Sequence, residues 1–281
     1  MSECDHCDHS HCSGCASNPK QNPQDVAIAD FLGHVKHKIV VMSGKGGVGK
    51  STVSVDLALL LSQRGYHVGL MDVDLHGPSV AGMLGFMDRH IQVENEKLVP
   101  FKYSDNLEFL SAQGFLAQQD DALIWRGPLK VGAIRQFMSD TQWDPLDYLI
   151  IDCPPGTGDE PLTVVQTIKD AEAIVATPQK VALADVRKSL NFCKLGNIKV
   201  RGIIENMSGF VCPHCGQEVD IFKAGGGKAL AEEKGLPFLG RIPIDPQVVA
   251  AEDAGNPLEN LSEASRKALD SIVDKVVAQD K

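Results

Sequence analysis

A glycine-rich run that ends in a lysine and a serine carries the clearest chemistry in this chain of 281 residues. It reads Gly44-Lys45-Gly46-Gly47-Val48-Gly49-Lys50-Ser51, and Thr52 follows directly. Glycines allow backbone N–H groups to approach phosphate oxygens that a Cβ atom would hold away. In such a loop Lys50 reaches the β- and γ-phosphates, and the Ser51 hydroxyl binds Mg²⁺. The run therefore predicts a nucleoside triphosphate site formed by residues 44–52.

Two acidic positions complete the expected magnesium site. The apolar run 148–152 ends in Asp152, a Walker B arrangement, and the run 68–73 leads to Asp74. Ligands of open α/β sheets lie at the carboxyl ends of parallel strands, and Mg²⁺ prefers oxygen ligands such as carboxylates. We therefore expect Ser51, Asp74 and Asp152 to hold Mg²⁺, although an acid after a strand is more often a turn residue when it stands alone. The loop 153–159 is rich in glycine and proline and has the composition of a switch that responds to the γ-phosphate.

The elements around these residues must place them at one edge of a sheet. Short apolar runs alternate with helical patterns from residue 38 onward, which predicts a doubly wound, mostly parallel α/β sheet with helices on both faces. The expected strands are 38–42, 68–73, 107–110, 148–152, 173–176, 200–204 and 238–242. The expected helices are 25–32, 52–64, 130–139, 162–169, 185–195, 228–233 and 263–278. The polar stretch 88–102 is interpreted as a small hairpin or a surface insertion.

The lysine that follows the first glycine narrows the class of ATPase. The pattern from Lys45 to Ser51 resembles the deviant Walker A motif of the MinD/ParA/nitrogenase-iron-protein class. That resemblance implies a homodimer in which Lys45 reaches the partner's phosphate, as an arginine finger does. It further implies catalytic roles for Lys45, Lys50, Asp74 and Asp152, with Asp74 orienting the attacking water.

The base-binding residues are also assigned by this resemblance. Asn206 matches the position that hydrogen-bonds adenine, and the turn containing Pro243 and Asp245 resembles the loop that covers the base. The Asn-Lys-x-Asp signature of guanine recognition is missing from the expected strand. ATP is therefore favoured over GTP.

A second pair of chemically active residues is Cys212 and Cys215, in a Cys-x-x-Cys knuckle. At this spacing both thiolates can point at one metal centre, and two chains would supply four. Together with the nucleotide motifs, Asn206-Met207-Ser208-Gly209 and Cys212-Pro213-His214-Cys215 resemble the Mrp/ApbC family of iron–sulfur cluster carrier ATPases. This resemblance implies a labile [4Fe–4S] cluster bridged by both protomers and transferred to apoproteins, with cluster-assembly proteins as further partners. The expected ATPase is slow, because hydrolysis serves a conformational change. Zinc, a redox dithiol and inert structural thiols remain as alternative interpretations of the pair.

The N-terminal segment 1–24 differs in composition from the ATPase domain 25–281. It contains Cys4, Cys7, Cys12 and Cys15 together with three histidines at positions 6, 9 and 11. Four cysteines suffice for a [4Fe–4S] cluster or tetrahedral zinc, and the histidines also suit nickel or copper. A disordered tail is the remaining interpretation.

Composition excludes several other functions. The formal charge of −10 argues against nucleic-acid binding, which depends on basic patches. No apolar run of transmembrane length and no secretory signal occurs, and the eight cysteines suit metal or free thiols in a reducing cytoplasm. A MinD/ParA-type positioning ATPase and a nickel or zinc metallochaperone NTPase are the rival functions. Positioning at a membrane would need a basic terminal helix bearing aromatic residues. The C-terminal helix instead carries an aliphatic stripe, which we expect to dock on the core: Leu269, Ile272, Val273, Val276 and Val277.

Overall fold

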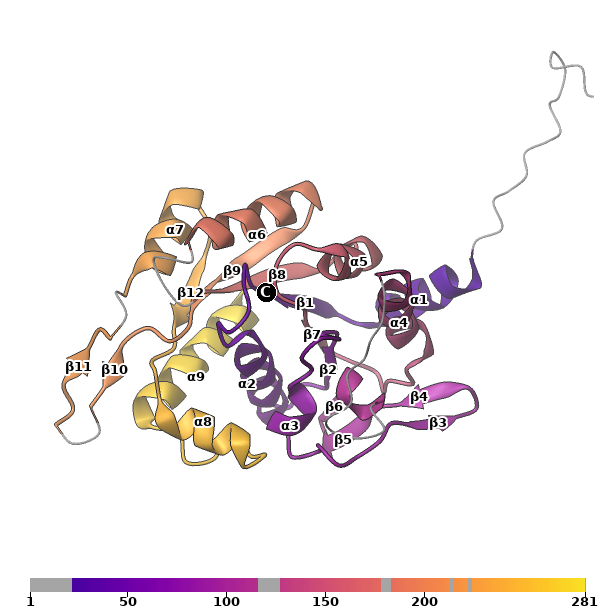
Figure 1. Cartoon of the computed structure of the whole chain (residues 1–281), viewed down its shortest axis with the longest axis horizontal. Coiled ribbons are helices and arrows are strands. Elements are labelled where there is room, and N and C mark those ends of the chain that lie inside the picture. Colours follow the sequence, from indigo (N-terminus) through magenta and orange to yellow (C-terminus); the bar gives the residue numbers. More distant parts are fainter. Residues whose placement is uncertain (1–21, 116–126, 178–182, 213–214, 222–223, 281) are drawn as a thin grey trace, which may run out of the picture.

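The computed structural model describes residues 22–115, 127–177, 183–212, 215–221 and 224–280. Within them, a central sheet of eight strands runs through the molecule (Figure 1). Its strands pair in parallel except at one edge, where β5 pairs antiparallel with β6. In spatial order the strands are β12 (Phe238–Arg241), β9 (Lys199–Glu205), β8 (Glu172–Thr177), β1 (His37–Met42), β7 (Tyr148–Asp152), β2 (Val68–Asp72), β6 (Leu107–Ser111) and β5 (Phe101–Ser104).

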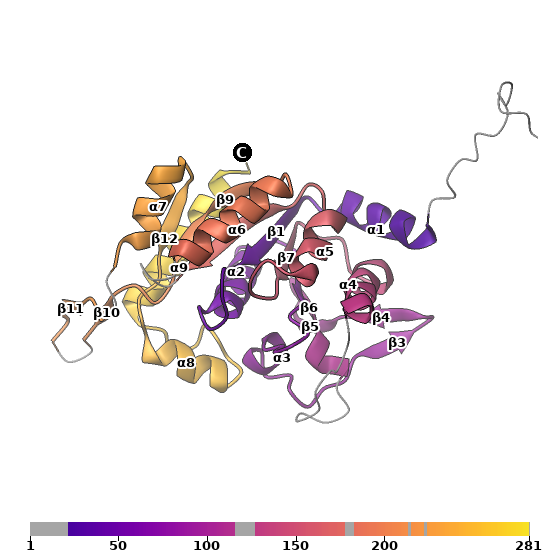
Figure 2. The same ribbon diagram turned by 45° about the horizontal axis from the view of Figure 1, so that its top comes forward.

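Helices cover both faces of this sheet, as the turned view in Figure 2 shows. One face packs against α2 (Lys50–Gln63) and α9 (Glu263–Ala278). The opposite face packs against α1 (Pro23–His34), α4 (Gly127–Asp140), α5 (Asp159–Thr167), α6 (Leu183–Leu195) and α7 (Gly226–Lys234). The short helices α3 (Val80–Met83) and α8 (Pro246–Asp253) contact each other.

The two cores follow from the alternation of side chains along each strand. In β1, Ile39 and Val41 join the core under α2 and α9, whereas Val40 and Met42 join the core under α1 and α4. Strands β2, β6 and β7 are buried along their whole length. Burial on both faces explains why these strands are nearly continuous apolar runs in the sequence.

The predicted fold class and all seven predicted strands are confirmed, with strand ends shifted by at most one residue. Most helices begin two or three residues before the predicted start, because their first turns are polar or glycine-rich and carry no apolar periodicity. Helix α1 begins at Pro23, with Asn22 as its cap, so its first residues fall inside the segment 1–24. The stretch 88–102 does contain a hairpin, formed by β3 (Gln92–Glu94) and β4 (Lys97–Val99).

Several short elements were not predicted from the sequence. They are the edge strand β5, the helices α3 and α8, the 3-10 turn Ala112–Phe115, and a second hairpin formed by β10 (Phe210–Val211) and β11 (Glu218–Val219). Each has too few residues for its own hydrophobic period to be recognised.

The C-terminal helix is fastened to the sheet by a buried arginine. Arg201 on β9 donates to the carbonyl oxygen of Val276 at 2.5 Å and pairs with Glu172 at 2.5 Å. Asp280, just beyond α9, pairs with Arg201 and accepts a hydrogen bond from Tyr148. The aliphatic stripe of α9 is therefore docked on the core, as predicted. None of the described helices has both the length and the apolar character needed to span a membrane.

Candidate functional site

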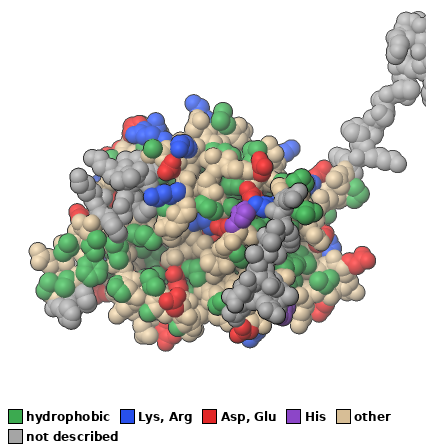
Figure 3. Space-filling model, viewed as in Figure 1, with side chains coloured by type: hydrophobic (Ala, Val, Ile, Leu, Met, Phe, Trp, Pro, Cys, Tyr) green, Lys and Arg blue, Asp and Glu red, His purple; other side chains and the backbone are tan. Residues whose placement is uncertain are grey.

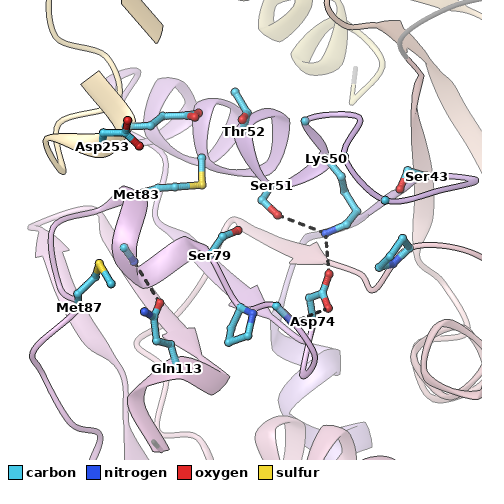
Figure 4. A pocket seen from close by; sticks show the side chains of 18 residues that line it. Ser43, Lys50, Ser51, Thr52, Asp74, Ser79, Met83, Met87, Gln113 and Asp253 are labelled. Carbon is cyan, nitrogen blue, oxygen red and sulfur yellow. Dashed lines mark hydrogen bonds and ion pairs between the residues drawn. The ribbon is translucent and has the colours of Figure 1, made fainter. Parts of the chain in front are cut away.

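The predicted nucleotide residues meet at the carboxyl edge of the sheet. Strands β1, β7 and β2 are neighbours, so the loops that follow them lie together. These loops border a cavity of about 590 Å³ that is also lined by the start of α2, by α3 and by the end of α8. Figure 4 shows Lys50, Ser51 and Asp74 around this cavity, with Ser79 and Met83 further along its wall.

The phosphate-binding loop needs glycine at its close approaches. Gly49 precedes α2 with a φ of +74°, and a Cβ there would lie 2.1 Å from Nδ2 of Asn206. A Cβ on Gly44 would lie 2.5 Å from the backbone carbonyl of Asp185 at the start of α6. The glycines therefore do two things: they leave room for phosphate oxygens, and they let the loop pack between β9 and α6.

Lys50 is buried and faces carboxylates. Its Nζ lies 2.8 Å from Oδ2 of Asp152 and 3.8 Å from Oδ2 of Asp74. Burial alone would lower the pKa of Lys50, but the attraction of Asp152, Asp72 and Asp74 outweighs it and raises this pKa. The lysine is therefore fully charged and sits at the mouth of the phosphate loop.

Asp152 is fully buried and organises the start of α2. The hydroxyl of Ser51 donates to its Oδ2 at 2.7 Å, and the hydroxyl of Ser54 donates to its Oδ1 at 2.7 Å. The Ser51 hydroxyl and the carboxylates of Asp152 and Asp74 are hard oxygen donors around a single lysine. This donor set fits Mg²⁺, and the surplus of acids over cations favours a divalent ion.

Asp72 is a site residue that the sequence analysis did not assign. It is fully buried and accepts hydrogen bonds from the N–H of Asp74 at 3.0 Å and from the Ser111 hydroxyl at 2.9 Å. Burial and the nearby Asp152 raise its pKa, with Lys50 opposing them. Asp72 thus shapes the loop that presents Asp74; the Asp-x-Asp spacing was the available signal. The pKa of Asp74 is raised as well, first by burial, while Lys50 works against the shift.

A second unassigned group lies at the far end of the cavity. Glu252, near the end of α8, lines it together with Asp253 and Thr52. Burial raises the pKa of Glu252 to about 7, with Thr52 lowering it through a hydrogen bond. The neighbouring Asp56 on α2 is completely buried, and burial together with the charge of Glu252 raises its pKa as well. These residues bring α8 into contact with the phosphate helix.

The loop after β2 is joined to the first turns of α4 and α5 by a polar cluster of His76, Lys130 and Glu160. Lys130 on α4 pairs with Glu160 at 2.9 Å, and Nε2 of His76 lies 3.2 Å from the same carboxylate oxygen. Burial would raise the pKa of Glu160, but the hydrogen bond and charge of Lys130, together with hydrogen bonds from the backbone of Glu160 and from His76, outweigh burial and lower this pKa. The cluster links the loop that carries Asp74 to the helix that follows the predicted switch loop, and no sequence motif marks this contact between distant residues.

Lys45 takes no part in the ion pairs that Lys50 forms with Asp152 and Asp74. Its side chain is exposed, and it forms no ion pair with any of the described residues. An exposed lysine at the mouth of the loop is in position for contact with another molecule. The role of Lys45 in a partner's site stays a prediction.

The predicted base-binding residues occupy two places. Asn206 is buried, and its Nδ2 donates to the carbonyl oxygen of Val48 in the phosphate loop at 3.0 Å. Pro243 and Asp245 line a neighbouring pocket rather than the cavity at the phosphate loop. Asp245 caps α8 by accepting from the N–H of Gln247 at 3.0 Å, and it also accepts from the Ser265 hydroxyl at 2.7 Å. Its carboxylate is thus already engaged, and its contact with a base stays a prediction.

The cysteine pair lies on the β10–β11 hairpin, which projects from the body beside α8 and β12 (Figure 1). The N–H of Gly216 donates to the carbonyl oxygen of Cys212 at 2.8 Å, which closes the turn; residues 213 and 214 lie outside the described residues. Cys215 is exposed and Cys212 is partly buried. Hydrophobic side chains gather on this side of the molecule in Figure 3, and Val211, Val219 and Ile221 of the hairpin region are exposed.

The described residues contain no group of three or more histidine, cysteine or acidic side chains placed to hold a metal ion. A centre with four thiolates therefore needs ligands beyond Cys212 and Cys215. Cys153 and Cys193 are buried, which raises the pKa of both thiols and leaves them unreactive core residues. The predicted ligands Cys4, Cys7, Cys12 and Cys15 lie outside the described residues.

Comparison with known proteins agrees with this geometry. Residues 34–277 match the family model described as ParA, NUBPL iron-transfer P-loop NTPase. The chain is 46% identical to an "Iron-sulfur cluster carrier protein" of Methanocaldococcus jannaschii, over 98% of each chain. It is 49% identical to a "Cytosolic Fe-S cluster assembly factor Nubp2 homolog" of Aedes aegypti, over 89% of this chain and 99% of the relative.

Among solved structures, a nucleotide-binding protein from Archaeoglobus fulgidus in complex with ADP superposes with a TM-score of 0.73. It is 36% identical in sequence, and the match covers 86% of this chain and 98% of the other.

Proposed function

The chain belongs to the NUBPL iron-transfer family of P-loop NTPases, and on that premise we propose that it is an ATP-dependent iron–sulfur cluster carrier. In this proposal a homodimer binds one [4Fe–4S] cluster as cargo, receives it from cluster-assembly proteins and passes it to apoproteins. Relatives are named as a cluster carrier and as a cytosolic assembly factor, and this supports both the cargo and a cytoplasmic location.

The nucleotide site supports ATP hydrolysis. Ser51, Asp74 and Asp152 would hold Mg²⁺, which neutralises charge on the β- and γ-phosphates when bound. Lys50 would exchange its ion pair with Asp152 for the phosphates, because its Nζ lies at the mouth of the loop. Asp74 would orient the attacking water, and Lys45 would place its charge in the partner's site.

The observation that carries the cargo assignment is the cysteine pair on its projecting hairpin. Two thiols, one of them exposed, are the only cysteine ligands that the described residues offer there. A [4Fe–4S] cluster normally takes four thiolates, so two hairpins would have to meet at one cluster. Such a cluster lies at a surface and can be released to another protein.

Cluster transfer provides the test. The protein, with Cys4, Cys7, Cys12 and Cys15 replaced by serine so that the N-terminal segment supplies no cluster, is reconstituted anaerobically with iron and sulfide. It is mixed with an apo-ferredoxin, and the acceptor's visible circular dichroism is followed. We expect transfer from this protein, and loss of transfer when Cys212→Ser and Cys215→Ser are added together. The matched control is Cys193→Ser, which changes a buried thiol on α6, outside the hairpin. Equal transfer by the double variant would contradict the proposal.

A further inference from the structure

The cysteine hairpin belongs to a segment that leaves the central sheet after β9 and returns to the body of the protein at α7. The chain leaves β9 at Glu205, forms the hairpin and re-enters the body at the start of α7. The two ends of this segment, near Ser208 and Gly225, are held by a single side chain. That side chain is the carboxylate of Glu205, the last residue of β9, which is fully buried.

Glu205 accepts hydrogen bonds from both ends. The Ser208 hydroxyl donates to its Oε1 at 2.6 Å, and the N–H of Gly225 donates to the same oxygen at 2.7 Å. Its Oε2 accepts from the N–H of Gly227 at 2.6 Å and from the N–H of Lys228 at 3.3 Å. The approach of α7 is so close that a Cβ on Gly227 would lie 2.9 Å from Oε2.

The same segment is bonded to the nucleotide site. The next residue, Asn206, donates to the carbonyl oxygen of Val48 in the phosphate loop at 3.0 Å. The N–H of Ile244 donates to the carbonyl oxygen of Gly209 at 2.7 Å, and Phe210 of the hairpin pairs in parallel with Ile244. Residues 205–210 therefore contact the phosphate loop on one side and the predicted base loop on the other. The first strand of the hairpin is therefore bonded directly to the predicted base loop, and the segment that leads into it is bonded to the phosphate loop.

We propose that Glu205 is the positioning residue that couples the nucleotide site to the Cys212–Cys215 pair. It holds the outgoing and returning ends of the hairpin as one unit with Asn206, so that a shift at the phosphate loop changes the setting of both thiols. The inference rests on the proposed function, because the proposed function assigns the roles of the nucleotide and of the cysteine pair. Glu205 itself touches neither.

The carboxylate is needed for this role because all four of its neighbours are donors. A glutamine of the same shape keeps one acceptor oxygen and turns an NH₂ group toward N–H or O–H donors. Glu205→Gln should therefore release one end of the hairpin while β9 stays paired. A residue that only caps α7 would change stability in the same way, but it would not change how the thiols respond to nucleotide.

The test measures that response in cluster-free, reduced, full-length protein. Cys212 and Cys215 are alkylated with N-ethylmaleimide, with and without a saturating magnesium complex of a non-hydrolysable ATP analogue, and rates are read from their peptide by mass spectrometry. Saturation is set by titrating each variant, and samples are compared only at equal oligomeric state by sedimentation velocity. The buried Cys153 and Cys193 report any unfolding. The matched control is Glu172→Gln, the same change at the opposite end of the neighbouring strand β8.

We expect nucleotide to change the wild-type alkylation rate about fivefold or more, the usual lower range for coupled sites. This ratio should fall to about one in Glu205→Gln and remain unchanged in Glu172→Gln. Ser208→Ala, which removes one donor, should give an intermediate ratio and decides the question if Glu205→Gln does not fold or does not bind nucleotide. A wild-type ratio of one, or an unchanged ratio in the Glu205→Gln or Ser208→Ala variant, would overturn the inference.

The outcome is separable from the proposed function. The assay needs neither hydrolysis nor a cluster, so an unchanged ratio in a protein that still transfers clusters removes only the coupling role of Glu205. Failure of cluster transfer would instead remove the carrier function and leave the measured coupling intact.

Discussion

Replacing Lys50 with methionine should destabilise the nucleotide-free protein as well as abolish its ATPase activity. Methionine keeps most of the volume of lysine but removes the charge that faces Asp152 at 2.8 Å and Asp74 at 3.8 Å. Asp152 is fully buried and keeps only its two serine donors. Removing one partner of a buried ion pair typically costs about 3–5 kcal/mol, because the other charge is left uncompensated. We expect a loss of about 3 kcal/mol in the free energy of unfolding.

Urea unfolding in EDTA at pH 7.5 measures this loss, and a double-mutant cycle assigns it. Asp152→Asn removes the charge that Lys50 balances, so Lys50→Met should cost at least about 1 kcal/mol less in that background. The loss should also shrink at pH 5.5, because burial raises the pKa of Asp72 to about 7, so its carboxyl is largely protonated at pH 5.5 and no longer attracts Lys50. Hydrolysis at saturating MgATP should fall at least about 100-fold. If the changes in unfolding free energy of the two single variants add up to that of the double variant within about 0.5 kcal/mol, the reasoning is refuted.

Two further predictions test other parts of the site. Burial raises the pKa of Glu252 from 4.5 to about 7, so between these pH values the folded state holds a proton that the unfolded state releases. The free energy of unfolding should therefore fall as the pH rises through this window, by up to about 3 kcal/mol. In urea titrations between pH 5 and pH 8, Glu252→Gln should reduce the dependence of the unfolding free energy on pH, and Asp56 should account for the dependence that remains. An unchanged pH dependence would show that Glu252 is not the group responsible. Mixing Lys45→Ala protomers with Asp74→Ala protomers should restore part of the phosphate release that each variant lacks, because both lesions fall in one of the two sites of the heterodimer. No recovery, with heterodimers verified by native mass spectrometry, would count against Lys45 acting in the partner's site.

The parts of the structure that the sequence predicted are those with a local cause. Strands such as β7 are apolar along their whole length because both faces are covered, so each forms a visible run. The phosphate loop is recognisable because the need for glycine at Gly49 and for a charge at Lys50 is met within a few consecutive residues.

What the sequence did not predict depends on contacts between distant residues. Glu252 meets the phosphate helix from 200 positions away, and nothing near it in the chain marks that contact. The role of Glu205 depends on N–H groups some 20 residues downstream. Helix α8 did carry a local signal, Asp245 as cap before Pro246, but its single apolar face is too short to be recognised as a helix.

The central claim, that two chains share one cluster, is tested most directly by counting iron and sulfide. The measurement uses the full-length protein with Cys4, Cys7, Cys12 and Cys15 replaced by serine, reconstituted anaerobically and analysed by iron and sulfide assay with sedimentation. We predict about four irons and four sulfides per dimer, lost together with the dimer in Cys215→Ser. Four irons per monomer, or zinc in place of iron after anaerobic expression, would contradict the account.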